Sequence, residues 1–182
     1  MPILQSMSIV LLGYRGSGKT TVGRLLAGRT GRAFIDTDEQ IVRRAGMTIK
    51  EIFECDGEQR FRDIESTVLD EVLRESDAVI ALGGGAILRP ANRQALRRSG
   101  HTCIYLAADA TTLHARIHAD PGTAQNRPAL TQLGGGIEEV RKVLQQREGL
   151  YQEVMTQKID VATLSAAQVV DQIVNGKTPS QG

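Results

Sequence analysis

Residues 13–20 combine the glycines, lysine and hydroxyl group that bind the phosphates of a nucleotide. They read Gly-Tyr-Arg-Gly-Ser-Gly-Lys-Thr, which is the pattern G-x-x-x-x-G-K-T of a phosphate-binding P-loop. Glycines in such a loop let backbone N–H groups turn toward phosphate oxygens. Lys19 would add a cation for the β- and γ-phosphates, and the Thr20 hydroxyl would bind Mg²⁺. An apolar run at 9–12 precedes the motif and a helical pattern follows it, which is the context that a P-loop requires.

Two carboxylates, Asp36 and Asp38, lie at the end of the next apolar run, 33–36. Two residues apart in an extended chain, they point to the same side, at the end of the strand where a parallel sheet binds ligands. One could accept a proton from a substrate hydroxyl, and the other could hold water on Mg²⁺. The structural alternative is a capping box between Thr37 and Gln40, with Asp38 in the first turn of a helix.

Two further groups could contact a substrate. Arg62 and Glu65 stand at i,i+3 on an expected helix, where they form either a surface ion pair or an arginine fork held for a carboxylate. Three glycines, Gly83, Gly84 and Gly85, directly follow an apolar strand. This run favours a close approach between backbone and ligand.

A long loop, 120–136, is rich in proline and glycine, which is typical of a functional lid. It contains Arg127, and an arginine there could neutralise charge in a phosphoryl-transfer transition state. On the helix after the loop, Arg147 and Tyr151 stand at i,i+4, which is also the spacing of an ordinary surface pair.

Strand-sized apolar runs alternate with helical patterns, which predicts an α/β fold with a parallel sheet and helices on both faces. The length of 182 residues suits one domain, 1–182, with a frayed tail at about 176–182. We expect strands at 8–12, 33–36, 78–82, 102–106 and 159–162, and helices at 19–30, 39–45, 49–54, 58–75, 92–98, 111–118, 138–154 and 166–174.

The composition limits the partners and the compartment. The net charge is +1 and aromatics make up 3% of residues, so we expect no binding to nucleic acid. The apolar runs are too short to span a membrane, and residues 1–8 lack the pattern of a signal peptide. Cys55 and Cys103 stand far apart, as free thiols of a cytoplasmic protein would.

Taken together, the motifs resemble those of the shikimate kinase family. The P-loop alone is shared by many enzymes, but the combination in this order is much more specific. The matching segments run from Gly13 to about Tyr151: Gly-x-x-Gly-Ser-Gly-Lys-Thr-Thr-x-Gly at 13–23, Asp-x-Asp at 36–38, Phe-Arg-x-x-Glu at 61–65, Gly-Gly-Gly at 83–85, Arg-Pro at 127–128 and Arg-x-x-x-Tyr at 147–151.

The resemblance implies a three-layer P-loop kinase fold: a five-stranded parallel sheet flanked by helices, an acceptor-binding helical region at about 37–65 and a lid at about 120–136. It implies transfer of the ATP γ-phosphate to the 3-hydroxyl of shikimate, in the pathway to chorismate and the aromatic amino acids, by a cytoplasmic enzyme that we expect to be monomeric. Mg²⁺ would be the cofactor, bound by Thr20 and, through water, by Asp36.

The resemblance also implies roles for individual residues. Lys19, Asp38 and Arg127 would be catalytic, with Asp38 as the base. ATP would be bound by Gly13, Gly16, Ser17, Gly18, Lys19, Thr20, Thr21, Arg127 and Arg116, the last at the place where the family stacks an arginine on adenine. Shikimate would be bound by Asp38, Gly83, Gly84 and Gly85, with Arg62 and Arg147 on its carboxylate.

Two other functions fit parts of the pattern. A kinase for another small hydroxy acid, such as gluconate, would share the P-loop, but the three glycines and Phe-Arg-x-x-Glu at 61–65 argue against it. A nucleotide-binding regulatory module without catalysis would share the loop too. Against it, every residue expected to be catalytic is present in the sequence.

Overall fold

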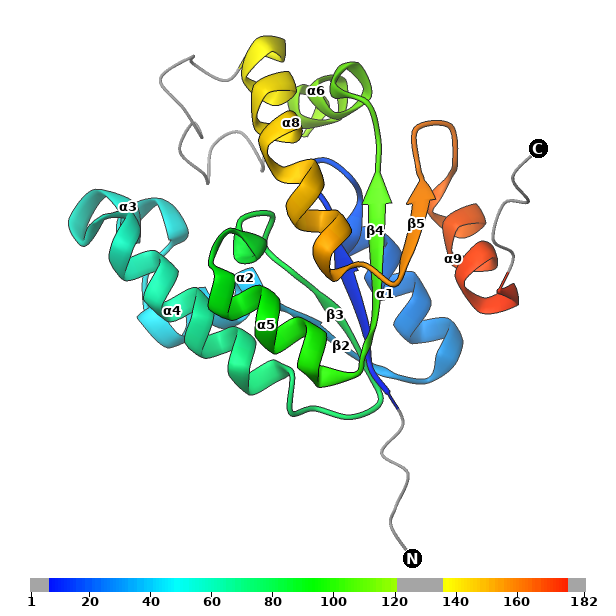
Figure 1. The fold of residues 1–182 in the computed structure, drawn as a ribbon, viewed down its shortest axis with the longest axis horizontal. Helices are drawn as coiled ribbons and strands as arrows, with labels where there is room; N and C mark the ends of the chain where they lie inside the picture. The colour runs from blue at the N-terminus through cyan, green and yellow to red at the C-terminus, as the bar shows by residue number, and fades with distance from the viewer. Residues whose placement is uncertain (1–6, 121–135, 177–182) are drawn as a thin grey trace, which may run out of the picture.

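The chain folds into three layers, with a parallel sheet between two layers of helices (Figure 1). The computed structural model describes residues 7–120 and 136–176. The sheet has five strands in the order β2-β3-β1-β4-β5, and every pair is parallel. The strands are β1 (Ile9–Leu12), β2 (Ala33–Asp36), β3 (Ala78–Ala81), β4 (Thr102–Ala107) and β5 (Gln157–Asp160).

Alternating side chains of the buried strands separate two parts of the core. Val10 and Leu12 of β1 face one cluster, whereas Leu11 between them faces the other. The first cluster lies under α4 (Gly57–Val72), α5 (Pro90–Ser99) and α8 (Ile137–Val154), which cover the face toward the viewer in Figure 1. The second lies under α1 (Lys19–Thr30) and α9 (Ala166–Asn175).

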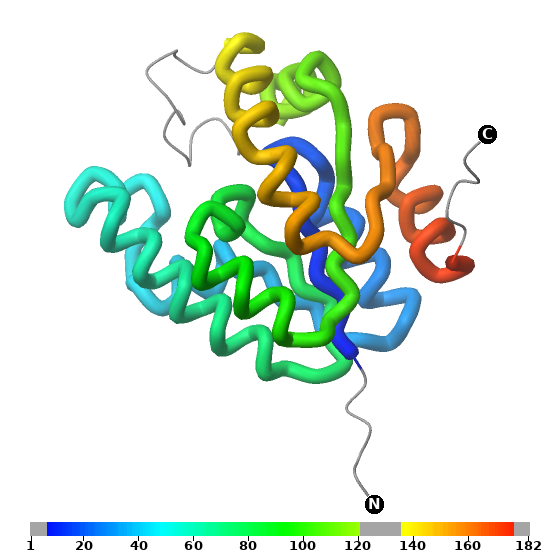
Figure 2. The backbone as a smooth tube through the Cα atoms, in the orientation of Figure 1, coloured from blue at the N-terminus to red at the C-terminus, as the bar shows by residue number. Residues whose placement is uncertain are grey.

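The remaining helices extend this framework beyond the sheet, as the tube in Figure 2 shows. The helices α2 (Thr37–Ala45) and α3 (Ile49–Cys55) pack against α4, which places them beside the end of β2. The helix α6 (Ala110–Ala119) packs against α8, and a short 3₁₀ helix, η1 (Ala86–Leu88), follows β3. The carboxyl ends of β1, β2 and β3 thus lie between two groups of helices.

The expected α/β fold with a parallel sheet is confirmed, and the differences are local. The last strand is Gln157–Asp160 and not 159–162. It is an edge strand in which only Ile159 is buried, so its apolar pattern is weak. The predicted strand therefore begins and ends two residues too late. The helix expected at 58–75 is Gly57–Val72, and the 3₁₀ helix at 86–88 was not predicted.

The helix expected at 39–45 begins at Thr37, and the capping box between Thr37 and Gln40 is wrong. The cap is Asp36, whose carboxylate accepts a hydrogen bond from the Asp38 N–H at 3.0 Å. Because the strand ends and the helix begins at neighbouring residues, both carboxylates are held at the same edge of the sheet.

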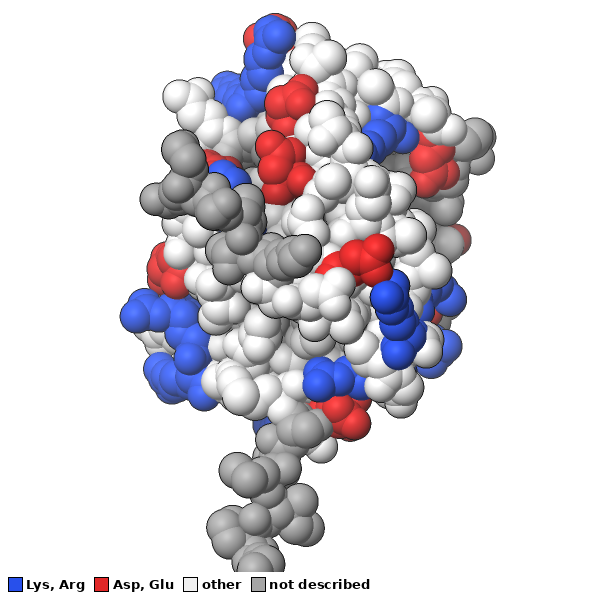
Figure 3. Space-filling model, turned by 90° about the vertical axis from the view of Figure 1, so that its right-hand side faces the viewer, with Lys and Arg blue, Asp and Glu red and all other residues white. Residues whose placement is uncertain are grey.

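The surface carries charges of both signs. On the face shown in Figure 3, basic and acidic side chains are interspersed, in keeping with the net charge of +1. Within residues 7–120 and 136–176, no helix has the length and apolar character needed to cross a bilayer.

We predict that two glycines of α1 respond oppositely to alanine. At Gly23 a Cβ would overlap the Phe34 ring and lie 3.3 Å from Leu11 Cδ1, whereas at Gly28 it would meet nothing within 4 Å. Gly23→Ala should therefore lower the free energy of unfolding by about 1–3 kcal/mol through overpacking. Gly28→Ala should raise it by about 0.5–1 kcal/mol because alanine favours the helix. Urea denaturation of both variants measures this, and an equal gain in both would show that α1 is not packed against β2 through Gly23.

Candidate active site

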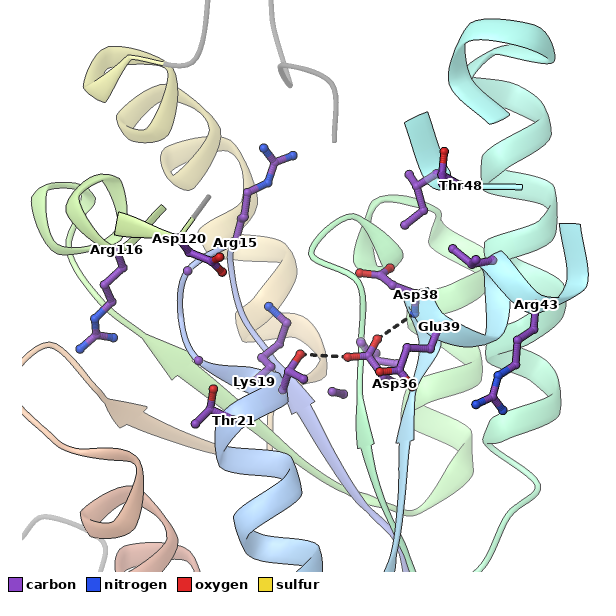
Figure 4. Close-up of a pocket in the computed structure, with 17 residues that line it drawn as sticks. Arg15, Lys19, Thr21, Asp36, Asp38, Glu39, Arg43, Thr48, Arg116 and Asp120 are labelled. Atoms are coloured by element: carbon purple, nitrogen blue, oxygen red, sulfur yellow. Dashed lines mark hydrogen bonds between the residues drawn. The ribbon is translucent and has the colours of Figure 1, made fainter. Parts of the chain in front are cut away.

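A cleft of about 750 Å³ opens at the carboxyl ends of β1, β2 and β3 (Figure 4). One wall carries Arg15, Lys19, Arg116 and Asp120, and the facing wall carries Asp36, Asp38, Glu39 and Arg43. Ligands of open α/β sheets bind at this end of the strands. Basic groups prevail on the first wall and acidic groups on the second, which suits two ligands that meet between them, one of them anionic.

The P-loop between β1 and α1 has the geometry of an anion cradle. Gly16 and Gly18 have φ angles of 81° and 89°, which side chains with a Cβ rarely adopt. Gly18 is the N-cap of α1, whose first turn carries no acidic residue. The positive end of the helix therefore points at the cleft, and the helix itself places no negative side chain in its first turn.

Two loop side chains connect this cradle to its surroundings. Lys19 Nζ donates to the carbonyls of Gly13 at 2.8 Å and Tyr14 at 3.0 Å, so the ammonium stands over the loop. The Thr20 hydroxyl donates to Asp36 Oδ2 at 2.9 Å. This pair of hard oxygen atoms is the donor set that Mg²⁺ prefers, and it lies beside the phosphate cradle.

Asp38 lies against the first glycine after β3. A Cβ on Gly83 would stand 2.7 Å from Asp38 Oδ1 and 3.2 Å from Glu65 Oε1, so only glycine leaves room for these carboxylates. Thr37 fixes the approach, since its hydroxyl donates to the Ala81 carbonyl at 3.3 Å and accepts from the Gly83 N–H at 2.9 Å. No local pattern in the sequence indicates this bridging role of Thr37.

Glu65 is buried and its partner Arg62 largely so, and the surface interpretation of this pair is wrong. Arg62 Nη1 donates to Glu65 Oε2 at 2.7 Å, and their side chains are 11% and 2% exposed. Burial raises the pKa of the Glu65 carboxyl, and the Arg62 charge opposes that shift. A Cβ on Gly85 would collide with the Arg62 guanidinium, so this glycine admits the arginine to the turn.

Arg147 and Tyr151 reach the same turn from α8, so they are not a surface pair either. Arg147 Nη1 donates to the Gly84 carbonyl at 3.0 Å, and the Tyr151 hydroxyl donates to it at 3.2 Å. Both residues are buried, and burial raises the pKa of Tyr151 to about 12. The Tyr151 hydroxyl is therefore a permanent donor that helps to hold the turn in place.

The predicted residues thus form two adjacent groups. Most of the residues expected at the nucleotide line the cleft, whereas Arg62, Arg147 and the three glycines lie beyond its lining, around a turn whose first glycine, Gly83, adjoins Asp38. Arg116 is at the cleft and donates to the carbonyls of Val161 at 2.7 Å and Ala162 at 3.3 Å. This contact brings the segment after β5 to the nucleotide side, which no motif in the sequence had indicated. Arg127 and most of the expected lid lie outside the described residues.

Comparison with known sequences gives one family. The shikimate kinase family model matches residues 15–176. The shikimate kinase of Nitrosomonas europaea is 44% identical over 167 residues, which cover 92% of this chain and 76% of that protein. The shikimate kinase of Chromobacterium violaceum is 38% identical and covers 96% of this chain and 95% of its own length.

Solved structures agree. The shikimate kinase of Acinetobacter baumannii, solved in complex with shikimate, superposes with a TM-score of 0.86 at 36% identity, covering 93% of this chain and 92% of that one. A gluconokinase from Sinorhizobium meliloti reaches only 0.58 at 22% identity, over 94% of this chain and 91% of its own, a likeness of fold alone. The chain belongs to the shikimate kinase family.

Proposed function

We propose that the chain transfers the γ-phosphate of ATP to the 3-hydroxyl of shikimate, giving shikimate 3-phosphate and ADP. One observation carries the proposal: the buried Arg147, the largely buried Arg62 and a carboxylate converge on the Gly83–Gly85 turn beside a P-loop. An acceptor with one carboxylate and several hydroxyls needs such a combination. A nucleoside monophosphate would instead need a pocket for its base.

The acceptor carboxylate would be held by Arg62 and Arg147. Arg62 comes from α4, where its Nη1 donates to Glu65 and its Nε and Nη2 donate to Glu58 Oε1 at 3.3 and 3.2 Å. Arg147 comes from α8 with one N–H on the Gly84 carbonyl. Each guanidinium keeps further N–H donors, and arginine binds a carboxylate through two parallel hydrogen bonds. The glycine turn between them would let the ring of the acceptor lie against backbone.

The phosphates would be held by the backbone of the P-loop, with Lys19 on the γ-phosphate. Thr20 and, through water, Asp36 fit Mg²⁺, since they offer hard oxygen atoms next to the cradle. The cation, when bound, neutralises charge on the β- and γ-phosphates. Ser17, Thr21 and the glycines at 13, 16 and 18 complete the loop.

The reaction step needs a base at the acceptor hydroxyl, and it needs the attacking oxygen, the γ-phosphorus and the leaving oxygen in line. Asp38 would accept the proton of the 3-hydroxyl as its oxygen forms a bond to the γ-phosphorus. The bond from that phosphorus to the β,γ-bridging oxygen breaks, and ADP leaves with the bond's electron pair. Lys19 would move with the transferring phosphoryl group, since charge develops there in the transition state.

The proposal extends to two further arginines, to the compartment and to the oligomeric state. Arg116, at the cleft and bound to the chain after β5, suits stacking on adenine. Arg127 stays a prediction as the lid arginine. We also propose that the protein is a monomer and that it is cytoplasmic. The reducing cytoplasm suits the free thiols of Cys55 and Cys103.

A coupled ADP-release assay tests the function. With ATP and Mg²⁺ present, shikimate should start ADP release and gluconate at the same concentration should not. ADP release with gluconate only would assign the chain to another hydroxy acid. Nucleotide binding with no ADP release from either acceptor would favour a regulatory module.

We predict that Arg62→Ala and Arg147→Ala each raise the KM for shikimate about tenfold or more, with little change in the KM for ATP. The estimate follows from charge-assisted hydrogen bonds of about 1.5–3 kcal/mol. Shikimate amide is the control: it should be a poor substrate of the native protein and should lose much less in both variants, because the charge that they bind is absent. Equal losses for acid and amide would show that the arginines do not bind the carboxylate.

We predict that Asp38→Asn lowers kcat by about 10²- to 10⁴-fold, the usual effect of losing a general base. Its affinity for ATP, measured by calorimetry, should stay near that of the native protein because the residue faces the glycine turn. Glu71→Gln is the control, since Glu71 is outside the lining of the cleft and pairs with Arg44, and it should leave kcat unchanged. A parallel fall of kcat and ATP affinity, or no change in kcat, would remove Asp38 from the reaction.

A further inference from the structure

Tyr14, the second residue of the P-loop, is buried where its neighbours in the loop border the cleft. Its side chain is 3% exposed and packs with Leu113 of α6 and with Val140 and Val143 of α8. Phosphate binding uses only the backbone of a P-loop at such a position. The large side chain therefore has a separate task.

The main chain of Tyr14 belongs to the phosphate side of the site. Its carbonyl accepts from Lys19 Nζ at 3.0 Å and from the Ser17 N–H at 3.2 Å. Any movement of Tyr14 would therefore alter the shape of the loop that carries the lysine.

The ring of Tyr14 belongs to the acceptor side. Arg147 Cζ lies 5.9 Å from its centroid, inside the roughly 6 Å over which a guanidinium is attracted to an aromatic face. Arg147 is itself buried, and its Nη1 is fixed on the Gly84 carbonyl at 3.0 Å. Arg147 also contacts the Tyr151 hydroxyl, and the Tyr14 ring adds a contact over its aromatic face that these polar contacts do not supply.

We propose that Tyr14 is a positioning residue that holds Arg147 for the acceptor carboxylate, and so sets the affinity for acidic acceptors from within the nucleotide loop. The inference rests on the proposed role of Arg147 at that carboxylate. A leucine at position 14 would still fill the space between α6 and α8, but it has no negative face for the guanidinium.

Variants at position 14 separate the ring from the packing. Tyr14→Leu should raise the KM for shikimate about three- to tenfold, the range of a partly buried cation–π contact, with the KM for ATP and kcat within about twofold. Tyr14→Phe keeps the face and should restore the native KM. Leu113→Val, in the same apolar cluster, should lower the melting temperature without raising the KM for shikimate. A KM rise in Leu113→Val as large as that in Tyr14→Leu would reduce Tyr14 to a packing residue.

Pentafluorophenylalanine at position 14 provides a second test, which can be used if Tyr14→Leu does not fold. It keeps the shape of the ring but withdraws the negative potential from its face. It should raise the KM for shikimate as Tyr14→Leu does, and a native KM with this residue would overturn the proposal.

A double-mutant cycle with Arg147→Ala distinguishes this proposal from the one it rests on. If Tyr14 acts through Arg147, Tyr14→Leu should add almost nothing to the KM for shikimate once Arg147 is alanine. If the fold-increases in the KM for shikimate of the two single variants multiply in the double variant, the positioning role is contradicted. If Arg147→Ala alone left that KM unchanged, the proposed role of Arg147 at the carboxylate would be contradicted, independently of any result for Tyr14.

Discussion

The backbone of the Gly83–Gly85 turn is the surface on which the acceptor half of the site is built. Asp38 and Glu65 lie against Gly83, the Arg62 guanidinium lies against Gly85, and Arg147 is bonded to the Gly84 carbonyl. The turn also approaches the P-loop, since a Cβ on Gly84 would stand 3.4 Å from the Gly13 carbonyl oxygen. Because the turn has no side chains, groups from α2, α4, α8 and the P-loop can share a very small volume.

The sheet order explains why these groups meet beside the phosphates. Strands β2 and β3 are neighbours and β1 lies next to β3, so the ends that carry Asp36, the glycine turn and the P-loop are adjacent. The hydrogen bond from Thr20 to Asp36 Oδ2, at 2.9 Å, ties the nucleotide side to the acceptor side at that edge. In the proposed reaction, donor and acceptor would therefore bind to one rigid framework, and proximity would contribute directly to the rate.

The sequence predicts the parts of this site that depend on local spacing and misses those that depend on burial. The P-loop, the carboxylates at 36 and 38 and the glycine run carry their own pattern, and all lie at one edge as the parallel sheet requires. The pairs Arg62–Glu65 and Arg147–Tyr151 have the spacing of ordinary surface pairs, and only packing shows that they are buried. Thr37 and Tyr14 form their contacts with residues far along the chain, which no local pattern reveals.

A crystal structure of the protein with MgADP and shikimate would test the central claim most directly. The account predicts the acceptor carboxylate between the guanidinium groups of Arg62 and Arg147, the ring against Gly83–Gly85, and the 3-hydroxyl within hydrogen-bonding distance of Asp38. The hydroxyl should face the β-phosphate of ADP held by the P-loop. An acceptor bound with its carboxylate away from both arginines, or with another hydroxyl against Asp38, would contradict the account.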